Sequence, residues 1–254
     1  MKDRRLWLLL AAALAVRLVL MPLPDPYDAD LSTFWRPWMA FAAQHGLVQL
    51  YLRGEPAVNY PPFYLALLAG LGALYRLVIP DFAYTPLQSI LIKLPGVVAD
   101  LGVTVLIYYA AQLTVAEGQK KTLPLAAAAL WAFNPAIIYV SAYWGQVDSI
   151  HTFWLLAALL AALGRRWGWS GVFMALSLLT KLQAIVLLPL LLFLAWRWRG
   201  LMRLGLGGAL TLAVGLLPFA ATGALRAVLS VYGCLLYTSP SPRDRTRSRM
   251  PSSA

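Results

Sequence analysis

The stretch Leu87 to Thr114, LQSILIKLPGVVADLGVTVLIYYAAQLT, decides the fold class. It is longer than the roughly 20 apolar residues that cross a bilayer as a helix, and its only charges are Lys93 and Asp100. Other apolar runs precede and follow it at Leu6–Met21, Pro62–Ile79, Leu123–Val140, Ile150–Leu163, Gly168–Thr180, Leu182–Trp196 and Leu204–Thr222. The sequence therefore predicts an all-α, polytopic transmembrane helical bundle of roughly eight helices at most.

The composition agrees with a membrane protein and excludes a water-soluble globule. Of 254 residues, 61% are hydrophobic and 12% are charged, whereas soluble domains keep about a quarter of their residues charged. The formal net charge is +11, but the basic residues lie at the ends of apolar runs. They are typical of positive-inside anchors in a membrane protein, so we expect no nucleic-acid partner.

The last residues, Cys234 to Ala254, change abruptly to CLLYTSPSPRDRTRSRMPSSA. Two blocks of this tail, 234–244 and 248–254, can be back-translated in one reading frame into DNA that resembles a sequencing adapter. We predict that residues 1–233 are the N-terminal fragment of a truncated membrane protein, and that residues 234–254 are disordered adapter read-through. A disordered basic C-terminus is the alternative. The only cysteine belongs to this tail, so we expect no disulfide.

Charge predicts the topology only in part. Lys2, Arg4 and Arg5 place the N-terminus in the cytoplasm, so the acidic and aromatic segment 22–60 is predicted to be an external loop. The basic segments Lys120-Lys121, Arg165-Arg166 and Arg197 to Arg203 all favour cytoplasmic loops. If one segment between Pro62 and Val140 is re-entrant or interfacial, Arg165-Arg166 and Arg197 to Arg203 return to the cytoplasm. Trp144 to Ser149 then shares the external face with segment 22–60, and we predict this arrangement.

Segment 22–60 contains a predicted short helix from Leu31 to Gln44. Phe34, Trp38 and Phe41 recur on one face of it, which is typical either of a helix lying in the headgroup layer or of an aromatic belt flanking a spanning helix. Asp28 and Asp30 directly precede it. These acids either act on lipid headgroups or simply cap the helix; a nucleotide-sugar Asp-x-Asp site would need a strand end in an α/β domain.

Four stretches in order resemble the clan C glycosyltransferases, which use polyprenyl-phosphate sugars. They are the double-proline helix start at 59–68 after the acidic loop, KLPGVVAD at 93–100, Asn134-Pro135 leading to YWGQVDS at 143–149, and TKLQA at 180–184. Within the clan, the likeness is to bacterial relatives of the second mannosyltransferase of GPI-anchor assembly. Members usually carry more helices than this chain, so inactivity of the fragment is an open alternative.

The resemblance and the chemistry of glycosyl transfer together suggest catalytic roles. Transfer from a lipid phosphate needs a carboxylate to take the acceptor's proton and cations to stabilise the leaving phosphate. Asp30 is the first candidate for the base and Asp28 the second. Lys93 and Lys181 are the candidate cations, with snorkelling to the interface as the alternative.

Other residues of the matched stretches are candidates for substrate binding. Asp148 and His151 lie one turn apart on a predicted helix and could orient a sugar or acceptor, although Asp148 or Ser149 could instead cap that helix. Asp100 either reaches toward Lys93 or pairs with another helix. The substrate-binding candidates are Tyr60, Lys93, Asp100, Gln146, Asp148, His151, Lys181 and Gln183.

The sequence therefore predicts a membrane hexosyltransferase that uses mannose as the donor sugar and has its site on the external face of the cell membrane. The expected partners are a lipid-linked sugar donor, a glycan or lipid acceptor and membrane lipids. We expect no cofactor, and a metal site is disfavoured because His45 and His151 have no cysteine or close histidine partner. A transporter is the alternative function, but the repeat between halves that is typical of transporters is not visible.

Overall fold

The computed structural model describes residues 3–24, 30–54, 57–119 and 122–236, with side chains described as far as Gly233. Within these ranges every regular element is helical, which confirms the predicted all-α class. The elements are α1 (Arg4–Leu20), η1 (Leu31–Trp35), α2 (Arg36–His45), α3 (Leu47–Arg53), α4 (Pro62–Val78), α5 (Pro86–Thr114), η2 (Glu117–Gln119), α6 (Leu123–Ala132), α7 (Pro135–Ile138), η3 (Tyr139–Trp144), α8 (Asp148–Leu163), α9 (Trp167–Leu178), η4 (Leu182–Leu187), α10 (Leu188–Leu194), α11 (Trp198–Ala221) and α12 (Leu225–Leu236).

Fewer helices than predicted are long enough to span a bilayer on their own. Among the described residues, α5 and α11 meet the length and apolarity of a span, and α6 with 135–144 makes a third if this pair, bent by 45°, counts as one. The break follows from Asn134-Pro135, because proline ends a helix ladder and Asn134 caps the next turn by accepting a hydrogen bond from Ala136 N. The apolar helices α4 and α8 and the segment 182–194 are shorter.

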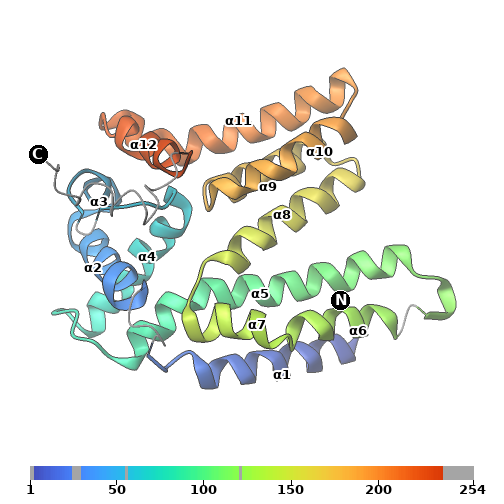
Figure 1. Ribbon diagram of the computed structural model, residues 1–254, viewed down its shortest axis with the longest axis horizontal. Coiled ribbons are helices and arrows are strands. Elements are labelled where there is room, and N and C mark those ends of the chain that lie inside the picture. The colour runs from blue at the N-terminus through green and yellow to red at the C-terminus, as the bar shows by residue number, and fades with distance from the viewer. Residues whose placement is uncertain (1–2, 25–29, 55–56, 120–121, 237–254) are drawn as a thin grey trace, which may run out of the picture.

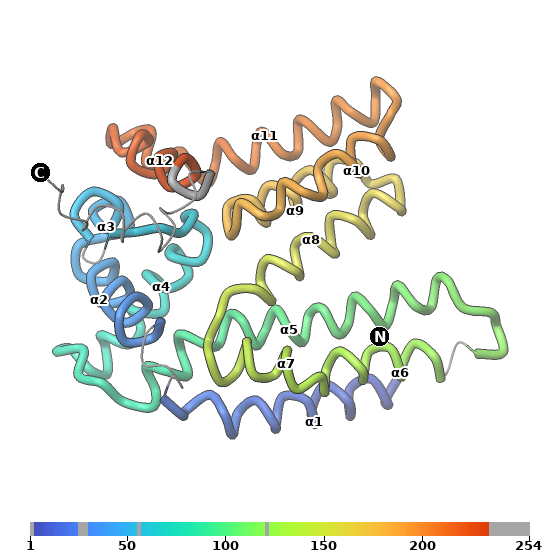
Figure 2. Tube along the Cα trace, viewed as in Figure 1, coloured from blue at the N-terminus to red at the C-terminus, as the bar shows by residue number. Residues whose placement is uncertain are grey.

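The helices run back and forth between two ends of the molecule (Figures 1 and 2). The connections α5–α6, α8–α9 and α10–α11 lie at one end, on the right in Figure 1. We call it the basic end, after Arg165, Arg166, Arg197 and Arg199. The other end holds α2, which follows Asp30 and η1, and the start of α8 at Asp148, and we call it the acidic end.

Helix α4 explains why the predicted topology did not close. It lies with α2 and α3 across the acidic end, and both the last turn of α1 and the first turn of α5 lie there too (Figure 2). The segment between Pro62 and Val140 that does not run from end to end is therefore α4. With α4 set aside, the arginine-rich connections fall at the same end as the N-terminus of α1, as the positive-inside rule requires.

The predicted short helix forms, but its aromatic face packs against protein. Residues Leu31–Trp35 are π-helical and Arg36–His45 are α-helical. Trp35 and Trp38 are 2% and 0% exposed, and the Trp35 ring lies 5.0 Å from both the Tyr60 and Tyr64 rings. Of the predicted aromatic face, Trp38 is buried against the neighbouring protein, whereas Phe34 and Phe41 are partly buried. The position of this helix relative to the headgroup layer stays a prediction.

Helices α9 and α11 approach so closely that only glycine fits between them. A Cβ at Gly171 would lie 2.0 Å from the Leu204 carbonyl oxygen, and one at Gly207 would lie 2.1 Å from the Gly168 carbonyl oxygen. Small residues at a helix interface let backbones pack tightly in membranes. This contact holds α9 against α11 and so fixes the position of Lys181, which follows α9.

The last described helix crosses the predicted junction at Gly233. Helix α12 continues to Leu236, so the backbone of residues 234–236 is helical. Residues 237–254 lie outside the described part of the chain, and their assignment to adapter read-through stays a prediction.

Candidate functional site

Two π-helical turns bring the acidic loop and the segment after α7 together. Asp30 directly precedes η1, and Trp144 ends η3. The Trp144 indole Nε1 donates a hydrogen bond to Asp30 Oδ2 at 2.7 Å, and Gln146 Nε2 donates to the same oxygen at 2.5 Å. The prediction that Asp30 and the segment 144–149 share one end of the bundle is thus confirmed. π-Helical turns occur often at functional sites.

Gly145 makes this double contact possible. Its φ of +80° is left-handed, a conformation that favours glycine, and it turns the chain so that Trp144 and Gln146 both reach Asp30. A Cβ at this position would lie 3.0 Å from Leu31 Cδ1 and 3.1 Å from Lys93 Cγ. The site therefore depends on glycine both for its backbone angle and for space.

Asp148 and Lys181 form the second polar contact of the site. Lys181 Nζ lies 2.6 Å from Asp148 Oδ1, and the side chains are 16% and 48% exposed, respectively. Asp148 opens α8 without capping it, since the capping position is Val147 and no side chain closes the helix end. The capping alternatives for Asp148 and for Asp30 are wrong, because neither side chain bonds its own helix end.

Tyr60 lies between the two polar contacts. Lys181 Nζ is 6.0 Å from its ring centroid, and Tyr51 Oη donates to the Tyr60 carbonyl at 2.7 Å. Burial above all, together with the Asp148 and Asp30 carboxylates, raises the pKa of the Tyr60 phenol to about 12. The phenol therefore keeps its proton at neutral pH and can donate a hydrogen bond.

Lys93 is enclosed by protein. It is 1% exposed, and its ammonium donates to the Leu23 carbonyl at 2.7 Å and lies 5.9 Å from the Tyr143 ring centroid. The snorkelling alternative is wrong for Lys93, because the side chain points between the end of α1 and η3. Its aliphatic stem lies beside Gly145, the residue between Trp144 and Gln146.

The remaining predicted residues differ in their distance from this cluster. His151 lies one turn after Asp148 and its Nδ1 is 2.9 Å from Ser177 Oγ, so it joins α8 to α9. Gln183 is exposed on η4. Asp28 lies outside the described residues.

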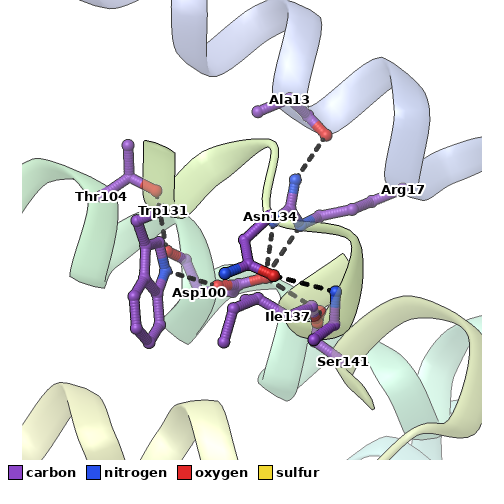
Figure 3. Close-up of polar contacts among 9 residues, drawn as sticks. Ala13, Arg17, Asp100, Thr104, Trp131, Asn134, Ile137 and Ser141 are labelled. Carbon is purple, nitrogen blue, oxygen red and sulfur yellow. Dashed lines mark hydrogen bonds and ion pairs between the residues drawn. The ribbon is translucent and has the colours of Figure 1, made fainter. Parts of the chain in front are cut away.

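Asp100 belongs to a separate buried cluster (Figure 3). Arg17 Nε donates to Asp100 Oδ2 at 2.9 Å, and both side chains are 0% exposed. Arg17 Nη2 lies 2.8 Å from the same oxygen, an electrostatic contact off the hydrogen-bond axis. Trp131 Nε1 donates to Oδ1 at 2.8 Å, and Ser141 Oγ donates to Oδ2 at 2.8 Å. The predicted pairing of Asp100 with another helix is confirmed, and its carboxylate faces protein rather than the site.

Sequence reasoning missed Arg17, Trp131 and Ser141. Arg17 is the one charge inside the run Leu6–Met21, which was a usable signal, because a charge within an apolar run needs a buried partner. Trp131 and Ser141 carried no comparable signal, since both residue types are ordinary in membrane helices.

Two apolar pockets flank Phe63, three residues after Tyr60. One, of about 420 Å³, lies between α4, α9 and α11 and is lined by residues such as Leu179, Val214 and Phe219. The other, of about 520 Å³, lies between α4, α5 and α8 and is lined by residues such as Leu94, Phe153 and Trp154. The main chain ties this region to the site, because Phe63 N donates to the Leu179 carbonyl at 2.9 Å.

Within the described ranges, no three of His, Cys, Asp and Glu lie together as metal ligands would. The polar groups of the site are instead two carboxylates, an ammonium, an amide, an indole and a phenol. This set can hold a hydroxyl-rich ligand and an anionic group, and it can accept a proton.

Comparison with known families places the chain. A family described as "PIG-U: GPI transamidase subunit PIG-U" matches residues 39–239. The chain belongs to the PIG-U family. No curated protein matches the chain, and no solved structure does.

Membership of the PIG-U family refines the sequence prediction. It supports a multipass membrane protein related to the clan C-like proteins. It does not support the second mannosyltransferase of GPI-anchor assembly as the family. The matched region includes Tyr60, Lys93, Asp148 and Lys181, whereas Asp30 precedes it.

Proposed function

We propose that this PIG-U family protein transfers a hexose from a polyprenyl-phosphate sugar to an acceptor hydroxyl at its acidic end. The observation that carries the proposal is the convergence of Asp30, Tyr60, Asp148 and Lys181 from four separate segments of the chain. Ionisable side chains that converge between the packed helices of a membrane protein are candidates for a functional site.

In the proposed reaction, Asp30 is the general base. The acceptor oxygen attacks the anomeric carbon and forms the new glycosidic bond, while the bond from that carbon to the phosphate oxygen breaks. The acceptor proton passes to the Asp30 carboxylate, and the bonding electrons leave with the polyprenyl phosphate. Trp144 and Gln146 hold Oδ2 in place, so the carboxylate is pre-oriented for the transfer.

Lys181 is the proposed partner of the leaving phosphate. Its ammonium is held by Asp148 at 2.6 Å and stays partly exposed, so a phosphate can approach without displacing it. Charge on the leaving group is stabilised best by a cation already in place. Lys93 is the second proposed cation, and Tyr60, Gln146, Asp148 and His151 are the proposed sugar contacts.

The apolar pockets beside Phe63 suit the hydrocarbon part of the donor. Both are lined by Phe63, three residues after Tyr60, and by apolar side chains of α4 and the helices packed against it. A polyprenyl chain seated there would put its phosphate near Lys181. We place the acidic end on the outside of the cell membrane, because the arginine-rich connections at the other end favour the cytoplasm.

A second function is favoured by the matched family, which is described as a subunit of a GPI transamidase. In that case the same cluster binds the glycan of a glycolipid and transfers nothing. The engagement of Asp30 by two donors is compatible with such a binding role.

One experiment separates the two functions. The full chain is reconstituted in phosphatidylcholine vesicles with radiolabelled polyprenyl-phosphate mannose, or the glucose analogue, and a membrane lipid extract as acceptor. A transferase converts the donor to polyprenyl phosphate and labels a new product, and Lys181→Met lowers this conversion. A binding subunit retains labelled lipid without converting it, and that result would contradict the transferase proposal.

A further inference from the structure

A polar pocket lies at the basic end, where the α8–α9 and α10–α11 connections are found (Figure 1). It has a volume of about 440 Å³ and is formed by the α8–α9 and α10–α11 connections. Arg165, Trp167, Trp196 and Arg197 line it, and the inner wall is apolar, with Leu163 and Leu194 among its residues.

The segments that form this pocket carry positive charge and contribute no acid. From Ser149 to Leu236 the sequence contains no Asp or Glu, while this stretch supplies Arg165, Arg166, Arg197 and Arg199. In the part of the chain that the structure describes, the ion pairs are Arg17–Asp100 and Lys181–Asp148, and neither involves the pocket. The site is therefore suited to an anion.

The backbone holds one of the arginines in an unusual conformation. Arg165 has a φ of +55°, which costs a non-glycine residue free energy and is common at ligand sites. The conformation is fixed by hydrogen bonds from Arg165 N to the Ala162 carbonyl at 2.9 Å and from Arg166 N to the Ala161 carbonyl at 2.8 Å. The first of the two arginines thereby lines the pocket, whereas Arg166 does not.

The side chains around the pocket indicate that its ligand comes from the membrane. Trp196, Trp198 and Leu163 are 78%, 75% and 63% exposed. Tryptophan is enriched at the level of lipid headgroups, and guanidinium groups bind phosphate through paired hydrogen bonds. Basic pockets between helices on the cytoplasmic side are typical binding sites for anionic headgroups.

We propose that the pocket between the α8–α9 and α10–α11 connections binds the headgroup phosphate of an anionic phospholipid. Arg165 and Arg197 contact the phosphate, Trp167 and Trp196 flank the glycerol region, and the acyl chains follow the apolar wall. Ordinary positive-inside anchoring depends only on how many basic residues the connections carry, whereas this site requires the two arginines that line the pocket. The proposal does not depend on glycosyl transfer.

The test compares two charge-matched double variants of the full chain. Arg165→Gln with Arg197→Gln removes the arginines that line the pocket, and Arg166→Gln with Arg199→Gln removes the same charge from the same connections. Each protein is placed in phosphatidylcholine nanodiscs containing a titrated fraction of phosphatidylglycerol, and bound lipid is counted by native mass spectrometry. Thermal unfolding in detergent checks that both variants fold.

The expected result is that the wild type and the control variant retain phosphatidylglycerol, while the pocket variant loses affinity by about tenfold or more, the scale of one or two charge-assisted hydrogen bonds. Equal losses in the two variants would show diffuse charge attraction and overturn the site. Equal retention of phosphatidylcholine and phosphatidylglycerol by the wild type would also overturn it, as would displacement of the lipid by millimolar inorganic phosphate. If the pocket variant alone fails to fold, Arg165→Lys with Arg197→Lys replaces it. This variant keeps the charge but loses the paired guanidinium contacts, so we expect weaker retention of phosphatidylglycerol than in the wild type, and retention equal to the wild type would overturn the arginine–phosphate contact.

Discussion

The buried Arg17–Asp100 pair should behave as a unit on which the stability of the bundle depends. It joins α1 to α5, and through Trp131 and Ser141 it also holds α6 and η3 on either side of the Asn134-Pro135 break. Because both side chains are 0% exposed, removing one leaves the other charged and unpaired in an apolar interior.

The expected magnitude follows from that burial. Asp100→Leu or Arg17→Met alone should lower the free energy of unfolding by about 3–5 kcal/mol, the usual cost of breaking a buried pair. The double variant should cost clearly less than the sum of the two, since neither charge is then stranded. Part of the loss at Asp100 comes from Trp131 and Ser141, which also lose their acceptor.

The assay is a double-mutant cycle on the full chain in mixed micelles, with unfolding followed by circular dichroism as the denaturing detergent is titrated. Arg4→Met is a suitable control, because Arg4 is exposed on the same helix. Single variants as stable as the wild type, or a double variant that costs the full sum, would refute the reasoning that the pair acts as a buried unit.

Three other substitutions test the site and the packing around it. Gly145→Ala should destabilise the protein by about 1–2 kcal/mol, because the residue has a left-handed φ. It should also lower hexosyl transfer more than the control Gly118→Ala, which changes a glycine with open space around it, and equal activities of the two variants would contradict the role of the turn. Gly171→Ala should disrupt the α9–α11 contact and lower the melting temperature by several degrees, measured by fluorescence in detergent, whereas an unchanged value would refute the close approach. Tyr60→Phe should keep the melting temperature, since the ring still packs on Trp35, but reduce transfer by roughly tenfold, the scale of one hydrogen bond; unchanged transfer would remove the phenol from the site.

The sequence predicted those features that depend on local composition. The apolar run at Leu87 to Thr114 became α5 almost residue for residue, because helix formation in a bilayer follows from the length of the run. Asp30, Asp148 and Lys181 were also found, since charged residues are rare in such a chain and each stood out beside an apolar segment. Their meeting at one end followed from the order of the helices.

The features that the sequence could not predict depend on which face of a helix meets protein. The stripe of Phe34 and Trp38 has the same periodicity whether it faces lipid or a neighbouring helix, because both environments are apolar. Only the position of α4 decides that Trp38 is buried. The partner of Asp100 was open for a similar reason, as Arg17 is far away in sequence and the two meet only when α1 packs on α5.

The central claim is that the Asp30 carboxylate takes the acceptor's proton during hexosyl transfer. The most direct measurement is the rate at which the reconstituted full chain converts radiolabelled polyprenyl-phosphate mannose, compared with Asp30→Asn and Asp28→Asn, with donor binding measured in parallel. We predict that Asp30→Asn binds the donor normally but converts it roughly 100-fold more slowly or worse, the usual contribution of a general base, and that Asp28→Asn loses much less. Conversion by Asp30→Asn and by the double variant at the wild-type rate would contradict the claim.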